Sequence, residues 1–100
     1  MTIEIKKEKN RLEASLEGRM DSTTAPEFEK KIFPELDGIT ELVLDFERLA
    51  YLSSAGLRAL LSCQKKIMAV QGTMVVRHVN EIIMEVFGAT GFDSILTIEN

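Results

Sequence analysis

The chain has 100 residues and a mass of 11.2 kDa, which is enough for one hydrophobic core and too little for a second domain. Hydrophobic residues make up 45% and charged residues 28%, a balance typical of a globular protein and not of a disordered one. The net charge of −4 argues against direct binding to nucleic acid, because phosphate contacts need a basic surface.

Apolar runs such as Leu42-Val43-Leu44 are too short to span a bilayer, which predicts no membrane insertion. Residues 1–4 lack the apolar stretch of a signal peptide. The single cysteine, Cys63, cannot form an internal disulfide and is expected to be a small buried side chain. Together these features predict a cytoplasmic protein.

The first fifth of the chain predicts an antiparallel hairpin. Apolar and polar residues alternate over residues 3–5 and again over 12–16, with a turn at 8–10. Gly18 is expected to end the second strand. Alternation of this kind leaves one face of the hairpin in water.

A helix is predicted next. Thr24 and Glu27 have the spacing of a capping box, and Pro26 suits a first helical turn. Pro34 should kink or end this helix. Its apolar stripe consists of Phe28, Ile32 and Leu36.

The run 42–44 predicts a central strand buried on both faces, and residues 45–52 are expected to be a connection. A long helix should follow Ser53-Ser54 and end at Gln71-Gly72. Gln64 lies within its apolar face without an evident reason. The remaining residues expected on that face are Leu57, Leu60, Leu61, Ile67 and Met68.

The last third predicts a strand over 74–76, a helix capped by Asn80 and stopped by Gly88, and a strand over 95–98. The order is therefore β-β-α-β-α-β-α-β. Its β-α-β-α-β middle implies parallel neighbours with right-handed crossovers. We predict a single α/β domain over residues 1–100, with a small mixed sheet and helices packed over it.

The segment most informative about function is Tyr51-Leu52-Ser53-Ser54-Ala55-Gly56-Leu57-Arg58. It places two serines where a strand meets a helix N-terminus, the positive end of the helix dipole. In one interpretation a serine is only an N-cap, worth about 1 kcal/mol. In the other, a hydroxyl accepts a phosphate of −1.5 to −2 charges, which a helix N-terminus tolerates.

Residues 49–57 resemble the signature loop of the bacterial anti-sigma factor antagonists, the STAS-domain family. Gly18-Arg19-Met20-Asp21 is similar to the segment before that family's first helix, and 41–46 to its central strand. Gln71-Gly72 and 86–92 are similar to its last third. The resemblance covers nearly the whole chain.

This resemblance implies a partner switch that controls transcription. Its members bind an anti-sigma factor that is also a serine-protein kinase, are phosphorylated by it, and are restored by a metal-dependent serine phosphatase. The phosphoacceptor position falls on Ser54, with Ser53 as the second choice. The sequence departs from the family where Ser53 replaces an Asp and Ala55 a Ser or Thr. The expected partner-binding residues are Asp21, Ser53, Ser54, Ala55, Gly56, Leu57 and Arg58.

Two alternatives belong to other functional classes. Stand-alone STAS proteins can serve as accessory subunits of membrane lipid transporters, without phosphorylation. The signature loop and the chain length favour the antagonist, whereas the replacement of the Asp by Ser53 gives some weight to the transporter alternative. An enzyme would need Ser54 as nucleophile and His78, the one imidazole, as base, in a motif that lacks the Gly-x-Ser-x-Gly pattern. We expect no enzyme, no cofactor and no metal site, since thiolate zinc sites need several Cys or His ligands.

Overall fold

The computed structural model describes residues 1–99, and within them one sheet has the strand order β1-β2-β3-β4-β5. Strands β1 and β2 pair antiparallel, and the other neighbours pair parallel. The strands are β1 (Thr2–Glu8), β2 (Arg11–Met20), β3 (Glu41–Leu52), β4 (Thr73–Arg77) and β5 (Thr97–Glu99). The helices are α1 (Ala25–Ile32), α2 (Ser54–Ala69) and α3 (Glu81–Thr90). This order confirms the predicted mixed α/β fold.

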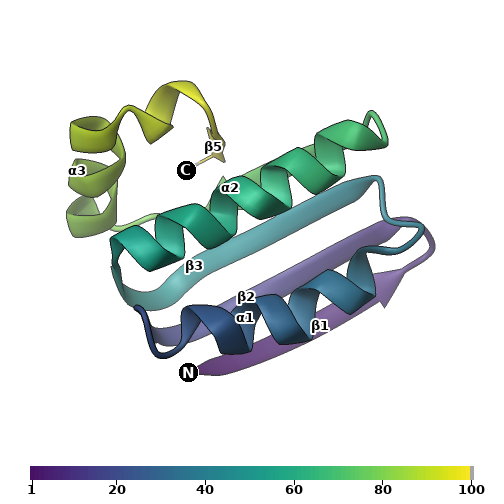
Figure 1. The fold of residues 1–100 in the computed structure, drawn as a ribbon, viewed down its shortest axis with the longest axis horizontal. Helices are drawn as coiled ribbons and strands as arrows, with labels where there is room; N and C mark the ends of the chain where they lie inside the picture. The colour runs from purple at the N-terminus through teal and green to yellow at the C-terminus, as the bar shows by residue number, and fades with distance from the viewer. Residues whose placement is uncertain (100) are drawn as a thin grey trace.

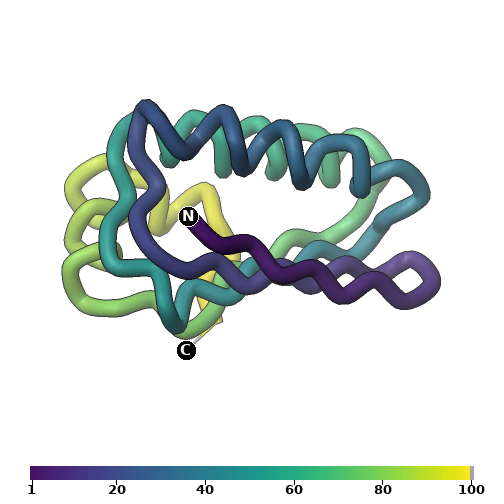
Figure 2. Tube along the Cα trace, turned by 90° about the horizontal axis from the view of Figure 1, so that it is seen from below, coloured from purple at the N-terminus to yellow at the C-terminus, as the bar shows by residue number. Residues whose placement is uncertain are grey.

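Helices α1 and α2 lie side by side over one face of the sheet, and α3 lies at one end of it (Figure 1, Figure 2). Side chains of β2 and β3 that face these helices are fully buried, as are those of α1 and α2 that face the sheet. Burial of each such side chain stabilises the fold by about 1.5–3 kcal/mol. Examples are Leu12, Leu44, Phe28, Ile32 and Leu60.

Strands β2 and β3 both run further than predicted. Strand β2 continues past Gly18, whose φ of 110° accommodates one of two register shifts against β3. The prediction of a connection over 45–52 is wrong, because β3 continues to Leu52. Irregular pairing breaks the alternation of buried side chains in β3, so the second half of the strand does not look like one in sequence.

The start of α1 also differs from the prediction. Thr24 occupies the N-cap position, but its side chain makes no capping hydrogen bond, so the predicted capping box is wrong. Asp21 instead closes the turn that precedes the helix, because its Oδ1 accepts hydrogen bonds from the N–H groups of Thr23 and Thr24, neither of which belongs to α1. Pro34 ends the helix as predicted, and the chain continues as a short 3-10 helix over Phe33–Leu36.

Helix α2 buries most of its predicted face. Leu57, Leu60 and Ile67 are buried, as is Cys63, whose burial raises the pKa of the thiol to about 12. Met68, however, is 62% exposed near the end of the helix, so its assignment to the core is wrong. Gln64 has a role after all, since its Nε2 donates a hydrogen bond to the carbonyl oxygen of Ile95.

Helix α3 begins as predicted and ends later. The Asn80 side chain accepts a hydrogen bond from the N–H of Ile83 and donates one to the carbonyl oxygen of Leu49. Gly88 does not stop the helix; Gly91 does, in a left-handed conformation with φ of 80°. A 3-10 helix over Phe92–Ser94 then delays the last strand to Thr97.

Candidate functional site at the start of helix α2

Ser53 and Ser54 lie at the junction where β3 passes directly into α2 (Figure 1). Ser53 is the N-cap residue in an extended conformation, and Ser54 is the first residue of the helix. The N–H of Ser53 donates to the carbonyl oxygen of Met20 at 2.8 Å, which joins this junction to the end of β2. The Ser54 side chain is exposed and Ser53 is half-buried. Of the two hydroxyls, that of Ser54 is therefore the one presented to a partner.

The N-terminus of α2 is open, in the sense that no side chain caps its first N–H groups. Ser53 makes no side-chain capping hydrogen bond, and its Oγ is buried with no hydrogen-bond partner in the described structure. The N–H groups of the first helical turn have no acceptor within the helix and point out of its start. The positive end of the helix dipole adds to them, so the surface around Ser54 favours an anion.

Close packing fixes the position of this first turn. A side-chain carbon added at Gly56 would lie 3.2 Å from the carbonyl oxygen of Met20 and would collide with the Leu52 side chain. Leu52 is 1% exposed and has little room to move. Glycine therefore lets α2 begin directly against the ends of β2 and β3.

Asp21 forms a tight turn beside this junction. Its Oδ1 holds the N–H groups of Thr23 and Thr24 at 2.9 and 3.1 Å. The Thr24 hydroxyl accepts from the N–H of Asp21 and donates to the carbonyl oxygen of Arg19. The hydrogen bonds from the Thr24 and Thr23 N–H groups hold the pKa of Asp21 below its ordinary value, so the carboxylate is charged at neutral pH.

A groove of about 340 Å³ runs between α1 and α2 next to Ser54. Its lining includes Ser22, Pro26, Glu29, Ala55, Arg58 and Ser62. Arg58 is exposed and forms no hydrogen bond or ion pair with the described part of the chain. The groove is thus lined mostly by small residues, together with one guanidinium group that has no partner among the described residues.

The structure brings the seven predicted contact residues to one end of the molecule, but they differ in exposure. Ser54 and Arg58 are exposed, and Asp21, Ser53 and Ala55 are partly so. Gly56 and Leu57 are buried, so they position the turn from below. Sequence reasoning missed Thr24 as an anchor of the Asp21 turn, although the Asp-x-x-Thr spacing is a signal of such a turn.

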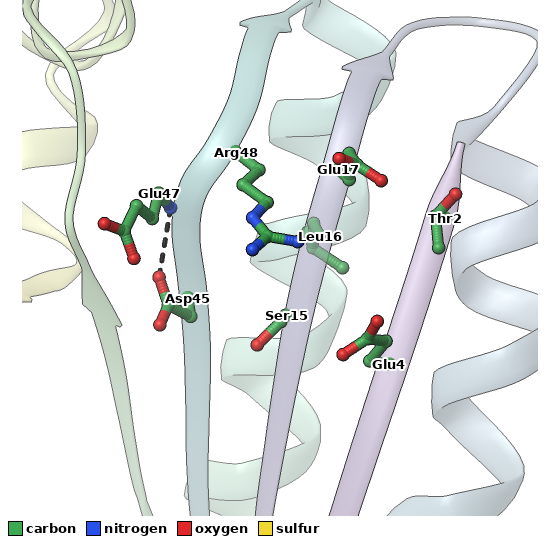
Figure 3. A pocket seen from close by; sticks show the side chains of 8 residues that line it. All are labelled: Thr2, Glu4, Ser15, Leu16, Glu17, Asp45, Glu47 and Arg48. Carbon is green, nitrogen blue, oxygen red and sulfur yellow. Dashed lines mark hydrogen bonds between the residues drawn. The ribbon is translucent and has the colours of Figure 1, made fainter.

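A second polar region lies on the opposite, open face of the sheet. A hollow of about 150 Å³ there is lined by Ser15, Arg48 and several carboxylates (Figure 3). At its side, Asp45, Glu47 and His78 bring possible metal-ligating atoms within 4.8 Å of one another. Asp45 is already engaged, since its Oδ1 lies 3.0 Å from His78 Nδ1 and accepts from the N–H of Glu47.

Known proteins resemble the chain along its whole length. The family model for the STAS domain matches residues 2–100. BtrV, a candidate anti-sigma factor antagonist of Bordetella bronchiseptica, is 39% identical over 88 residues, 87% of this chain and 76% of BtrV.

Two solved structures share the fold. A candidate anti-sigma factor antagonist of Thermotoga maritima has a TM-score of 0.91 at 20% identity, covering 98% of this chain and 86% of that one. The Bacillus cell fate determinant SpoIIAA in its phosphorylated form has a TM-score of 0.76 at 19% identity, covering 99% and 92%.

The chain therefore belongs to the STAS-domain family. Within it, the identity to BtrV groups the chain with the anti-sigma factor antagonists, which are non-enzymatic regulators. Among residues 1–99, no helix is both long and apolar enough to cross a membrane.

Proposed function

We propose that this protein is an anti-sigma factor antagonist that binds an anti-sigma factor with serine-kinase activity and is released when Ser54 is phosphorylated. The observation that carries the proposal is the exposed Ser54 hydroxyl on the first residue of α2, at an open helix N-terminus. Relatives support it, since BtrV is described as a candidate anti-sigma factor antagonist, and SpoIIAA, which shares the fold, has a structure in its phosphorylated form.

The proposed contact surface is the end of the molecule that carries Asp21, Ser53, Ser54, Ala55 and Arg58. Adding a phosphate to Ser54 would place about two negative charges within that surface. An unpaired charge buried at an interface costs several kcal/mol, and each 1.4 kcal/mol is tenfold in affinity. Phosphorylation could thus end binding without unfolding the domain, because the modified residue is exposed and lies at the positive end of α2.

Ser54 is the proposed acceptor and Ser53 the less favoured one. A kinase must reach the hydroxyl that it modifies, and the Ser53 Oγ is buried. The proposal includes a metal-dependent serine phosphatase that restores the free hydroxyl, and a cytoplasmic location in which both partners act.

The test is retention of lysate proteins on the immobilised chain, with and without Mg-ATP, followed by mass spectrometry of both the retained protein and the chain. Without ATP we expect retention of an anti-sigma factor with an ATP-binding kinase domain. With Mg-ATP we expect its release and one phosphate on the peptide that contains Ser54. Ser54→Ala should retain that partner in the presence of ATP, and Ser54→Asp should bind it at least tenfold more weakly.

Ser94→Asp is the matched control, because Ser94 is an exposed serine outside α2 and the same charge is added there. It should bind like the unmodified protein. Retention of a nucleotide-hydrolysing transporter subunit, with no phosphate gained, would overturn the proposal in favour of a transporter accessory role. Equal affinity of Ser54→Asp and Ser54→Ala would also contradict it.

A further inference from the structure

Arg58 lies one helical turn after Ser54, and this spacing gives the two side chains a common helix face. Both are exposed, and both belong to α2. Residues i and i+4 of a helix have their Cβ atoms about 5–6 Å apart. Helical side chains also lean toward the N-terminus of their helix, so the long Arg58 side chain can reach back toward Ser54.

We propose that Arg58 pairs with the phosphoryl group on Ser54, so that phosphorylation adds a dianion and also withdraws the free cation of the α1–α2 groove. This inference rests on the proposed function, since it describes the modified state of that site. In the phosphorylated protein, Arg58 is then a positioning residue for the phosphate.

The charges available to Arg58 favour this pairing. In the unmodified protein the guanidinium has no hydrogen bond or ion pair with the described residues, so no existing contact must break. The carboxylate that shares the groove with it is Glu29, across on α1, and the two form no ion pair. A phosphate offers about two charges and three acceptor oxygens, and guanidinium binds such oxygens in a bidentate fork.

The direction of the pair along the helix is also the favourable one. An anion placed N-terminal to a cation at i,i+4 follows the helix dipole, and the reverse order opposes it. Ala55, three residues before Arg58, has only a methyl side chain and so offers no polar group that competes for the guanidinium. The same argument does not apply to Ser53, which lies outside the helix and whose hydroxyl is buried.

The pairing has a consequence for the switch. In the unmodified protein, Arg58 is free to contact an acidic or carbonyl-rich surface on the partner. In the phosphorylated protein the same guanidinium would be engaged within its own helix. The partner would then lose this cation as a contact and would meet a phosphate that keeps about one net negative charge after pairing.

The experiment uses the full chain with phosphoserine installed at position 54 during translation. The pKa of the phosphoserine is measured by ³¹P NMR as a function of pH, for the parent protein and for Arg58→Gln. Asp21, in the turn joined to this junction, and Glu29, which lines the groove with Arg58, are present in both proteins, so their effects on the phosphate cancel in the comparison. We expect Arg58→Gln to increase the proton affinity of the phosphate roughly two- to fivefold at low salt.

Lys65→Gln is the matched control, because it removes the same charge from an exposed position two turns further along α2. It should leave the phosphate pKa unchanged. Arg58→Lys should fall between the parent and Arg58→Gln, since it keeps the charge and loses the fork. The differences should shrink at 1 M salt.

Equal phosphate pKa values in the parent protein and Arg58→Gln would overturn the inference, as would an equal rise in Lys65→Gln. Because the phosphate is installed without a kinase, the result does not depend on whether Ser54 is the acceptor in the cell. Failure of the proposed function would appear separately, as partner binding that is insensitive to Ser54.

Discussion

The two long helices that follow a strand, α2 and α3, begin in different ways. Asn80 closes the start of α3, with hydrogen bonds to the N–H of Ile83 and the carbonyl oxygen of Leu49. Ser53 occupies the same position before α2 and makes no such bond. The start of α3 is thus held by a side-chain cap. The start of α2 is held by close packing at Gly56, and its first N–H groups have no side-chain acceptor. An open helix start beside an exposed serine suits an external or covalently added anion.

Replacing Gly56 should have the largest effect, because α2 depends on close packing there. In Gly56→Ala the new methyl group would meet Leu52 and the Met20 carbonyl oxygen. We expect the free energy of unfolding to fall by about 1–3 kcal/mol, the usual cost of overfilling a packed site. Urea denaturation measures it. A variant as stable as the parent would show that packing at Gly56 does not hold this turn.

Removing the α3 cap should have the next largest effect. Asn80→Ala deletes both the capping bond and the bond to Leu49, and should lower the free energy of unfolding by about 1–2 kcal/mol. Asn80→Asp keeps the acceptor for Ile83 and should lose less. Denaturation curves of the two variants separate these contributions, and identical curves would contradict the role given to the cap.

The lowered pKa of Asp21 predicts that the stability of the fold depends on pH only in the acid range. Hydrogen bonds from the Thr24 and Thr23 N–H groups lower its pKa in the folded state. A lowered folded pKa gives stability that is present above the unfolded value, near 4, and is lost as the pH falls through the folded pKa. A carboxyl ¹³C titration should show Asp21 titrating below the ordinary aspartate value near 4. An ordinary pKa for Asp21 would contradict the turn.

Ser53→Ala should have the smallest effect on stability. The hydroxyl is buried without a partner, so its removal breaks no hydrogen bond. We expect a change within about 0.5 kcal/mol, in contrast to the loss in Asn80→Ala. If Ser53→Ala lost as much stability as Asn80→Ala, the N-terminus of α2 would be capped in solution and the comparison between the two helices would fail.

The element order and the place of Ser54 were predictable from sequence, because strong apolar periodicity marks each helix and a short apolar run marks the central strand. The second half of β3 was not, since its bulged pairing with β2 breaks the alternation that identifies a strand. The Asp21 turn was missed for a related reason. In sequence Thr24 looks like a helix N-cap. Only the fold shows that its hydroxyl donates to the carbonyl oxygen of Arg19, while Asp21 accepts from the N–H groups of the turn before α1.

Likewise, only the fold shows that Ser53 leaves the N-terminus of α2 uncapped. Serine is a common N-cap residue, and Ser53 in sequence is indistinguishable from one. The structure instead buries its hydroxyl where no N–H group of the helix reaches it. The exposure of Arg58 could be read from its position on the polar face, but its lack of a partner could not, since that depends on the groove between α1 and α2.

The most direct test of the account compares the affinity of the anti-sigma partner for the chain with and without phosphoserine at position 54, while ¹H–¹⁵N NMR spectra monitor the fold. We predict that affinity falls at least a hundredfold and that amide shifts change only around the β3–α2 junction, the Asp21 turn and Arg58. Undiminished affinity for a chain fully phosphorylated at Ser54 would contradict the account, as would a loss of binding accompanied by shifts throughout the sheet.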